Sequence, residues 1–230
     1  MSITAYRQAI AEYGFNPIQR VLDQYQVAAL RAALQSAIRG RTAKDYAMRR
    51  LLELIPTVHQ LCSEVSIRAL VEPILGSEAF PVRGIFFDKN PEANWSVSWH
   101  QDLTIAVRQR VDTPGFGSWS IKDDVHHVQP PISILEGMLS LRIHLDDADL
   151  DNAPLLVLPG SHRQGRLQPE TIHSKKACAV ACPVPCGGVL VMKPLLVHAS
   201  RRARTPAHRR VIHIEFAAEN LPNGLQWYGS

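Results

Sequence analysis

The sequence predicts a mainly β fold, a sandwich or barrel of short strands, with helices at its N-terminal end. Before position 76, apolar residues recur at the three- and four-residue spacing of helices; after position 80, they gather in short runs of branched and aromatic side chains. No twelve-residue helical pattern separates those runs, which argues against a parallel Rossmann-like sheet. The 230 residues, 46% of them hydrophobic, suit one domain with its own core.

Three helical patterns are expected within residues 1–76. Their apolar faces are Leu22, Val27, Leu30, Leu34 and Ile38, then Tyr46, Leu51, Leu54, Ile55, Val58 and Leu61, and last Ile67, Leu70, Val71 and Ile74. Gly40 and Gly76 follow the first and third patterns, and we expect them to end those helices because glycine is a common helix stop.

Residues 77–230 are expected to form the β core. The predicted strands are 81–88, 95–99, 138–145, 155–158, 188–193 and 210–216, with proline, glycine, asparagine and aspartate between them. The segment 108–131 contains Pro114, Gly115, Gly117, Pro130 and Pro131, and we expect a long irregular loop there. Loops of this length are uncommon and often functional, for example as lids.

Composition and charge narrow the choice of partners and compartment. The net charge of +4 and a pI near 9.0 are too mild to predict nucleic-acid binding. No run of eighteen apolar residues exists and the N-terminus lacks a secretory pattern, so we expect no membrane partner and a cytoplasmic location. Cys62, Cys178, Cys182 and Cys186 are expected to be reduced thiols, and the last three lack the spacing of a zinc site.

Several common enzyme motifs are missing from the sequence. It contains no glycine-rich dinucleotide fingerprint, no phosphate-binding P-loop and no nucleophile-elbow pentapeptide. The candidate chemistry lies instead in histidines and a carboxylate.

His100 and Asp102 are two positions apart beside the predicted strand 95–99. Alternate residues of a strand face the same side, so both side chains can reach one ion if the strand continues to Asp102. His198, which follows the strand 188–193, is the third candidate ligand. Two histidines and one carboxylate form the facial triad of non-haem iron oxygenases, which leaves positions open for a cosubstrate and O2.

Arg209 follows His198 and begins the last predicted strand, so it can project into a barrel. A planar guanidinium suits a bidentate grip on a carboxylate. Iron, this arginine and a nearby hydroxyl together describe a site for a dicarboxylate cosubstrate. His213 lies four positions further along the strand, faces the same side and is a candidate for lining the pocket.

Four motifs carry a resemblance to a known family. They are Trp99-His100-Gln101-Asp102-Leu103, Leu158-Pro159-Gly160-Ser161-His162, His198-Ala199-Ser200 and His208-Arg209-Arg210-Val211-Ile212. In this order the chain resembles the phytanoyl-CoA dioxygenase-like family of non-haem iron(II)/2-oxoglutarate-dependent oxygenases. Gly14-Phe15 and Val21-Leu22 look like the N-terminal opening of that family, so the resemblance covers nearly the whole chain.

The resemblance implies a double-stranded β-helix, a jelly-roll or cupin-like barrel, with the helices packed outside. It implies that His100, Asp102 and His198 hold iron(II). Arg209 is expected to pair with the distal carboxylate of 2-oxoglutarate, and Ser200 to hydrogen-bond it. Arg142 lies where the family often has an aromatic residue, and we expect it to meet an anionic group of the cosubstrate or the substrate.

The implied reaction is hydroxylation of a small, anionic metabolite with O2, with release of succinate and CO2. Halogenating relatives have a small residue at the position of Asp102, so this carboxylate favours hydroxylation or a related oxidation. A cupin-type metalloenzyme that needs no 2-oxoglutarate, for which Arg209 is dispensable, and a non-catalytic binding module on the same scaffold are the alternatives. The sequence is compatible with a monomer or a homodimer.

Several further residues carry expectations about the pocket. Arg108, Arg110 and Lys122 flank the long loop, and an anionic substrate follows if they face the cavity. Trp119 in the same loop is the most plausible aromatic contact for the substrate. Lys89 precedes the metal motif and could line the entrance to the site, but we expect it at the surface.

Overall fold

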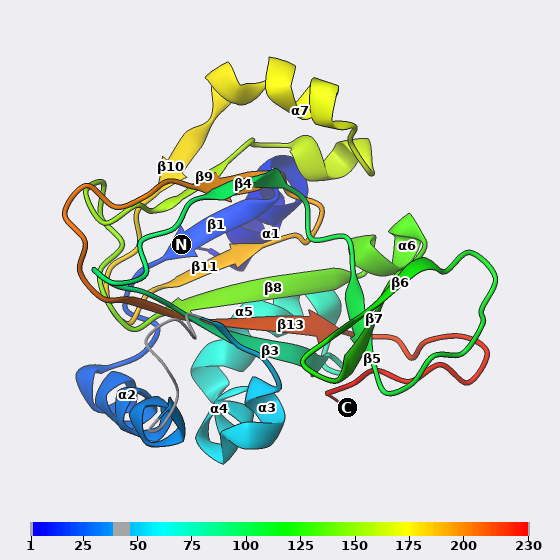
Figure 1. Ribbon diagram of the computed structural model, residues 1–230, viewed down its shortest axis with the longest axis horizontal. Helices are drawn as coiled ribbons and strands as arrows, with labels where there is room; N and C mark the ends of the chain where they lie inside the picture. The colour runs from blue at the N-terminus through cyan, green and yellow to red at the C-terminus, as the bar shows by residue number, and fades with distance from the viewer. Residues whose placement is uncertain (1, 39–46, 230) are drawn as a thin grey trace.

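The computed structural model describes residues 2–38 and 47–229. Two antiparallel sheets face each other, and a small third sheet extends to one side (Figure 1). Gly40 and Tyr46, which belong to two of the predicted helical patterns, lie outside the described residues.

The strands form sheets of six, four and three strands. The six-stranded sheet has the order β1 (Phe15–Ile18), β11 (Val189–Met192), β8 (Met138–His144), β13 (Arg209–Ala217), β3 (Phe80–Lys89) and β2 (Ala47–Met48). The four-stranded sheet has the order β10 (Val180–Cys182), β9 (Leu155–Val157), β12 (His198–Ser200) and β4 (Val97–His100). The third sheet has the order β5 (Ile105–Val107), β7 (Val125–Gln129) and β6 (Gly117–Lys122).

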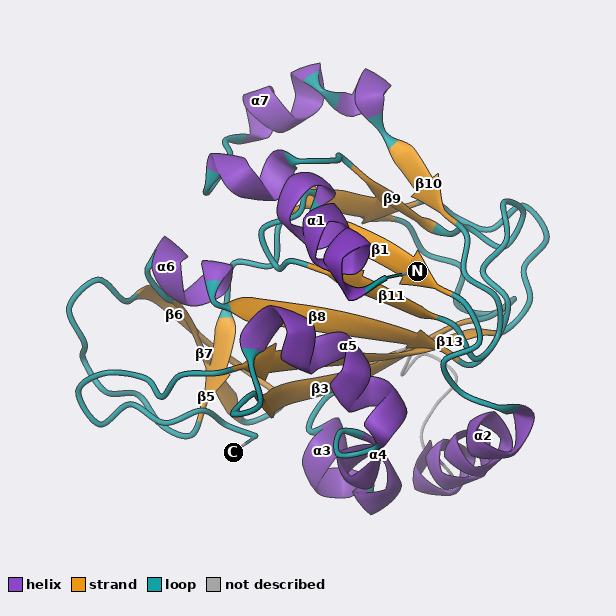
Figure 2. Ribbon diagram, turned by 180° about the vertical axis from the view of Figure 1, so that it is seen from behind, coloured by secondary structure: helices purple, strands orange, loops and turns teal. Residues whose placement is uncertain are grey.

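The helices that cover the outside of the six-stranded sheet are α1 (Ile3–Tyr13), α2 (Gln24–Ile38), α3 (Leu51–Leu54), α4 (Pro56–Leu61) and α5 (Val65–Leu75). α6 (Ile132–Glu136) packs with the apolar cluster of the three-stranded sheet, and α7 (Pro169–Ser174) packs beside the four-stranded sheet. Seen from behind, α5 crosses the sheet and α1 lies beside β1 and β11 (Figure 2). In the described part of the chain, no helix is both long and apolar enough to cross a membrane.

The second predicted helical pattern is divided into α3 and α4 at Pro56. Proline disfavours helical backbone in the residue before it, here Ile55, and cannot donate to the preceding turn. Its position as the first residue of α4 suits that helix, because the first amide of a helix needs no intrahelical partner.

The six-stranded sheet has two chemically different faces, which follow from the alternation of side chains along each strand. On β13, Ile212 and Ile214 point outward and belong to the apolar core shared with the helices. Arg209 and His213 occupy the opposite phase and line the cavity between the two main sheets. One face of β13 therefore packs in the apolar core, and the other face lines the polar cavity.

The prediction of an irregular loop over 108–131 was wrong. Most of the segment is a β-hairpin in which β6 pairs with β7, and β7 pairs in turn with β5. Asp123 and Asp124 form its tip, both with positive φ (49° and 61°), as hairpin turns with two central residues require. The turn lacks the glycine that usually marks such hairpins, whereas the prolines and glycines at both ends of the segment resemble loop signals.

Candidate metal centre

His100, Asp102 and His198 converge at the end of the four-stranded sheet, each offering one atom within 4.8 Å of the others. The Nε2 atoms of His100 and His198 lie 3.8 and 3.7 Å from the two carboxylate oxygens of Asp102. The two histidines are direct partners in the pairing of β12 with β4, which brings them together across 98 positions of sequence.

The orientation of both rings suits metal binding. Nδ1 of His100 lies 2.8 Å from the carbonyl of Ser98, and Nδ1 of His198 lies 2.8 Å from the carbonyl of Leu196. A carbonyl only accepts, so each Nδ1 carries the hydrogen, and each Nε2 presents its lone pair to the cluster. Such carbonyl partners fix the orientation of metal-binding histidines. Two imidazole nitrogens and a carboxylate thus fit a divalent iron ion.

Asp102 reaches the cluster although β4 ends at His100. Its backbone N–H donates to the carbonyl of Pro194 at 3.0 Å, and the neighbouring Gln101 side chain bonds both to the carbonyl of Leu195 (2.7 Å) and to the backbone of the 165–167 segment. These bonds replace the missing strand. Burial raises the pKa of the Asp102 carboxyl, but the surrounding histidines and Arg83 outweigh it and bring the pKa to about 2. The carboxylate is therefore ionised and ready to bind a cation.

Arg209 and Ser200 lie at the other end of the same cavity. Arg209 is buried, donates to the carbonyl of Ala153, and its Nε has no hydrogen-bond partner among the described residues. Burial, reinforced by Arg142, lowers the pKa of Arg209 to about 9. No carboxylate of the described chain pairs with this guanidinium, which leaves capacity for an anionic partner.

Lys89 is buried, and the prediction of a surface lysine was wrong. Only 2% of its surface is exposed, and its Nζ donates to Ser200 Oγ at 2.9 Å and to the carbonyl of Arg201 at 2.8 Å. Burial, with the nearby Arg209 and Arg142, lowers the pKa of Lys89 to about 7. Lys89 is the partner of Arg209 in the pairing of β3 with β13, so two cationic groups stand side by side at this end.

Arg142 lies on β8 between the metal cluster and this cationic end. Its Nη1 is 3.4 Å from Nδ1 of His213, whose Nε2 is 3.4 Å from Glu215 Oε1. Glu215 in turn pairs with Arg83 at 3.1 Å. The chain of contacts orients Arg142, while its Nε has no partner among the described residues. His213 lines the cavity as expected.

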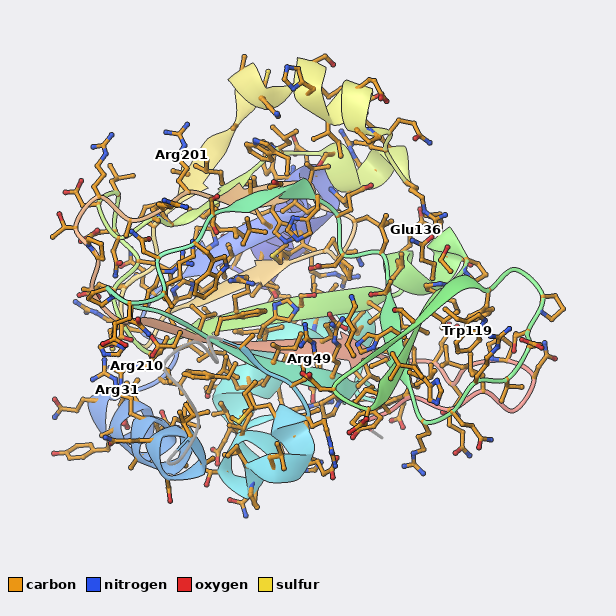
Figure 3. All side chains as sticks on the ribbon, in the orientation of Figure 1. Arg31, Arg49, Trp119, Glu136, Arg201 and Arg210 are labelled. Atoms are coloured by element: carbon orange, nitrogen blue, oxygen red, sulfur yellow. The ribbon has the colours of Figure 1, made fainter. Side chains whose placement is uncertain are left out.

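The other candidates divide between two cavities and the apolar core. The cavity at the metal cluster has a volume of about 210 Å³, and an adjoining cavity of about 420 Å³ is lined in part by Arg108. Arg110 pairs with Asp112 and stacks on Trp119 instead, and neither it nor Lys122 lines these two cavities. Trp119 packs on the second apolar cluster, far to the right in Figure 3, and lines neither cavity, so its contact with the substrate stays a prediction.

His144 departs from the usual buried histidine, whose ring nitrogens are hydrogen-bonded. It lies in the core and faces the cavity side of β8, but neither ring nitrogen has a hydrogen-bond partner in the described chain. Burial, with Arg142 and Arg209 nearby, places its pKa well below the ordinary value, so the ring is neutral.

A double-stranded β arrangement with two histidines and one carboxylate in its cavity defines a class: non-haem iron oxygenases of the cupin or jelly-roll type. The chain matches the model of the family described as Phytanoyl-CoA dioxygenase (PhyH) over residues 10–211. It therefore belongs to the phytanoyl-CoA dioxygenase family, whose members are iron- and 2-oxoglutarate-dependent dioxygenases. No curated protein matches the sequence significantly.

Solved structures with the same fold support this assignment. The carbocyclase SnoK from nogalamycin biosynthesis, described as non-haem and α-ketoglutarate-dependent, superposes with a TM-score of 0.73 at 18% identity, over 96% of this chain and 85% of SnoK. EctD from S. alaskensis, solved with 2-oxoglutarate and 5-hydroxyectoine, has a TM-score of 0.73 at 19% identity, over 95% and 76% of the two chains. AviO1 from Streptomyces viridochromogenes Tue57 has a TM-score of 0.67 at 23% identity, over 96% of both.

These findings confirm four of the predictions: the family, the fold class, the enzyme class, and iron with 2-oxoglutarate as its cofactor and cosubstrate. SnoK is described as a carbocyclase, whereas EctD was solved with 5-hydroxyectoine, so the fold alone does not choose a substrate for this chain.

Proposed function

We propose that this protein hydroxylates a small, anionic metabolite, using iron(II), 2-oxoglutarate and O2 and releasing succinate and CO2. The observation that carries the proposal is the His100–Asp102–His198 cluster, in which both histidines use Nδ1 for a backbone carbonyl and turn Nε2 toward the carboxylate. When bound there, iron supplies the activation of O2 that couples decarboxylation of the cosubstrate to oxidation of the substrate.

We assign the cosubstrate to the opposite end of the 210 Å³ cavity. Arg209 is the clamp for its distal carboxylate, since this guanidinium is buried without a carboxylate partner. Ser200 is the hydroxyl beside it, held by Lys89, which supplies a second positive charge. Arg142, between the two ends, is assigned to the carboxylate nearest the metal. The protein's own part is to orient this dicarboxylate and to keep the cavity dry.

The reaction outcome follows from Asp102. Its carboxylate occupies the ligand position that a halide needs in halogenating relatives, so oxygen transfer is the expected chemistry. The substrate's charge follows from the cavity. Five cationic side chains line it against two carboxylates. Iron(II) and doubly charged 2-oxoglutarate cancel, so the surplus of positive charge remains when both are bound and favours an anionic substrate. The cationic residues are Arg49, Arg83, Lys89, Arg142 and Arg209.

The test is an anaerobic titration of the metal-free protein with iron(II) and then 2-oxoglutarate, followed through the visible charge-transfer band of the chelate. We expect the band in the wild type and its loss in His198→Ala. Iron binding without a band favours the cupin-type enzyme that needs no 2-oxoglutarate, and absence of iron binding leaves only the non-catalytic module. Release of succinate and a product one oxygen atom heavier than the substrate identify hydroxylation.

We further propose that the protein acts in the cytoplasm on a small-molecule substrate, as a monomer or homodimer, without nucleic-acid or membrane partners. All four cysteines are unpaired thiols, which suits a reducing compartment. Burial raises the pKa of Cys62 and of Cys182 to about 12, so these two thiols are unreactive at neutral pH.

A further inference from the structure

The larger cavity, of about 420 Å³, adjoins the metal cavity, and we call it the outer chamber. The two cavities share Arg49, Arg83 and Ile85, which we call the neck. Apolar groups such as Leu52 and Val125 and polar groups such as Tyr228 line the chamber beyond the neck. Its walls are therefore suited to a molecule with both apolar and polar parts.

The volumes of the two cavities indicate which ligand each one can hold. The metal cavity measures about 210 Å³ and has to hold an ion and a five-carbon dicarboxylate at once. Pockets for small organic ligands usually measure from about 300 to 1,000 Å³. The outer chamber falls within that range and the metal cavity does not. The bulk of the substrate therefore belongs in the outer chamber, with only its reacting part beyond the neck.

The neck is positively charged, and its ion pairs leave capacity for a ligand. Among the described residues, Arg49 bonds a side chain only through Nη1, 2.8 Å from Asp123 at the tip of the hairpin, and its Nε has no partner there. Arg83 uses Nη1 for Glu215 and for the carbonyl of Thr104. The side chain of Asp123 is 57% exposed, so its pair with Arg49 is weak and can yield to a ligand.

The surplus of charge extends through both cavities. Seven lysine and arginine side chains line them against three carboxylates. His127, which lines the outer chamber, adds no charge, because burial lowers its pKa to about 4. The surplus stays at three even if the buried Lys89 is counted as neutral. An anionic group bound between Arg49 and Arg83 neutralises part of this positive charge at the entrance to the metal cavity.

We propose that the substrate is an organic anion that spans the neck, with its carboxylate or phosphate group on Arg49 and Arg83. Its larger part fills the outer chamber, and a carbon close to the anionic group faces the metal. Oxidation is then expected near the acid end of the molecule. This inference rests on the proposed function, because it places the reacting carbon beside the metal cluster.

The experiment measures binding of matched pairs of probes by calorimetry to protein held anaerobically with iron(II) and 2-oxoglutarate. Hexanoate, octanoate and 4-phenylbutyrate are each compared with the corresponding amide, and hexyl phosphate with hexanol. We expect at least one acid to bind about tenfold or more tightly than its neutral partner, the effect of one charge-assisted hydrogen bond. The carboxylate and phosphate arms show which anion the neck accepts. Failure of every acid to exceed its neutral partner overturns the proposal.

Arg49→Gln is the informative variant, because removing Arg83 leaves Glu215 buried without its partner and endangers folding. We expect Arg49→Gln to weaken the acid by about tenfold while the neutral partner is unchanged. Asp123→Asn removes the same ion pair but keeps the guanidinium, so acid binding is expected to be equal or tighter. Arg110→Gln, at an arginine that lines neither cavity, is the control for net charge. Equal acid affinity in Arg49→Gln and wild type overturns the proposal.

The charge-transfer band separates this inference from the proposed function. The band is expected to survive in Arg49→Gln, since the variant leaves the metal cluster and the cosubstrate end intact. Absence of the band in the wild type refutes the proposed function. The acids can still be compared with their neutral partners on the metal-free protein. The result then tests only whether the neck binds an anionic group.

Discussion

Replacing Lys89 by methionine is expected to stabilise the protein and to weaken its grip on 2-oxoglutarate. Methionine retains most of the apolar length of the side chain and removes the ammonium group. Lys89 is 2% exposed, and no carboxylate of the described chain pairs with it. A buried cation in this position is unfavourable for the folded protein until an anion arrives. The variant is therefore expected to be more stable and to bind 2-oxoglutarate less tightly, a trade-off that is common at functional sites.

The magnitude follows from the pKa of Lys89, which falls from 10.5 to about 7 on folding. At 1.36 kcal/mol per pKa unit, this shift corresponds to about 5 kcal/mol against the charged form. The substitution also loses the hydrogen bonds to Ser200 and to the carbonyl of Arg201, at about 1 kcal/mol each. The expected net gain for Lys89→Met is about 3 kcal/mol in the free energy of unfolding below pH 7.

The pH dependence gives the sharper test. Between about pH 7 and 10.5, Lys89 binds fewer protons in the folded than in the unfolded protein, so wild-type stability rises with pH across that window. The advantage of Lys89→Met is therefore full below about pH 7, shrinks as the pH rises above 7, and is lost before the pH reaches 10.5. Urea denaturation of the ligand-free proteins at several pH values measures it, with the exposed Lys176→Met as control. Loss of stability in Lys89→Met near pH 6.5, or a gain that does not change with pH, refutes the reasoning.

Three further substitutions test the site and the scaffold. Arg209→Gln is expected to raise the dissociation constant of 2-oxoglutarate by about tenfold to a hundredfold while iron binding persists, and an unchanged charge-transfer titration contradicts the assigned clamp. Gln101→Ala removes three hydrogen bonds of a side chain that is 6% exposed, and we expect it to lower the free energy of unfolding by about 2–4 kcal/mol in urea. Gly14→Ala brings a Cβ to 2.3 Å from His162 Nδ1 at a φ of 83°, so a fall of several degrees in Tm is expected, and an unchanged Tm contradicts the crowding.

The sequence was sufficient to predict the three clustered residues because their pattern is local. His100 and Asp102 are two positions apart, and His198 belongs to a short motif that follows a strongly apolar strand. Their convergence depends on the pairing of β12 with β4, which the family resemblance supplied and which spacing alone does not establish. Asp102 reaches the cluster from a turn beyond the strand, so the strand argument gave the right residue for an incomplete reason.

The buried Lys89 was missed because the predicted strand ended one residue too early. The strand runs to Lys89, and in the alternation of β3 this residue has the same phase as Phe87, Ile85 and Arg83, which line the cavity. A lysine at the end of a strand is usually solvated, and only the tertiary fold shows that the four-stranded sheet covers it. The outer chamber is still less accessible to sequence reasoning, since Arg49, Val125 and Tyr228 meet there from distant parts of the chain.

Different segments of the chain form the metal cluster and the outer chamber, and this has a consequence for how such enzymes acquire new substrates. His100 and His198 of the metal cluster are held by paired strands, whereas the outer chamber is walled by β3, by residues of β5 and β7, by the segment that leads into α3, and by the C-terminal residues. Arg49, near the centre of Figure 3, joins two of these walls through Asp123 alone among the described salt bridges. Surface segments tolerate replacement better than packed strands. Exchanging the hairpin between relatives is thus a route to new substrate range that leaves the oxygen chemistry in place.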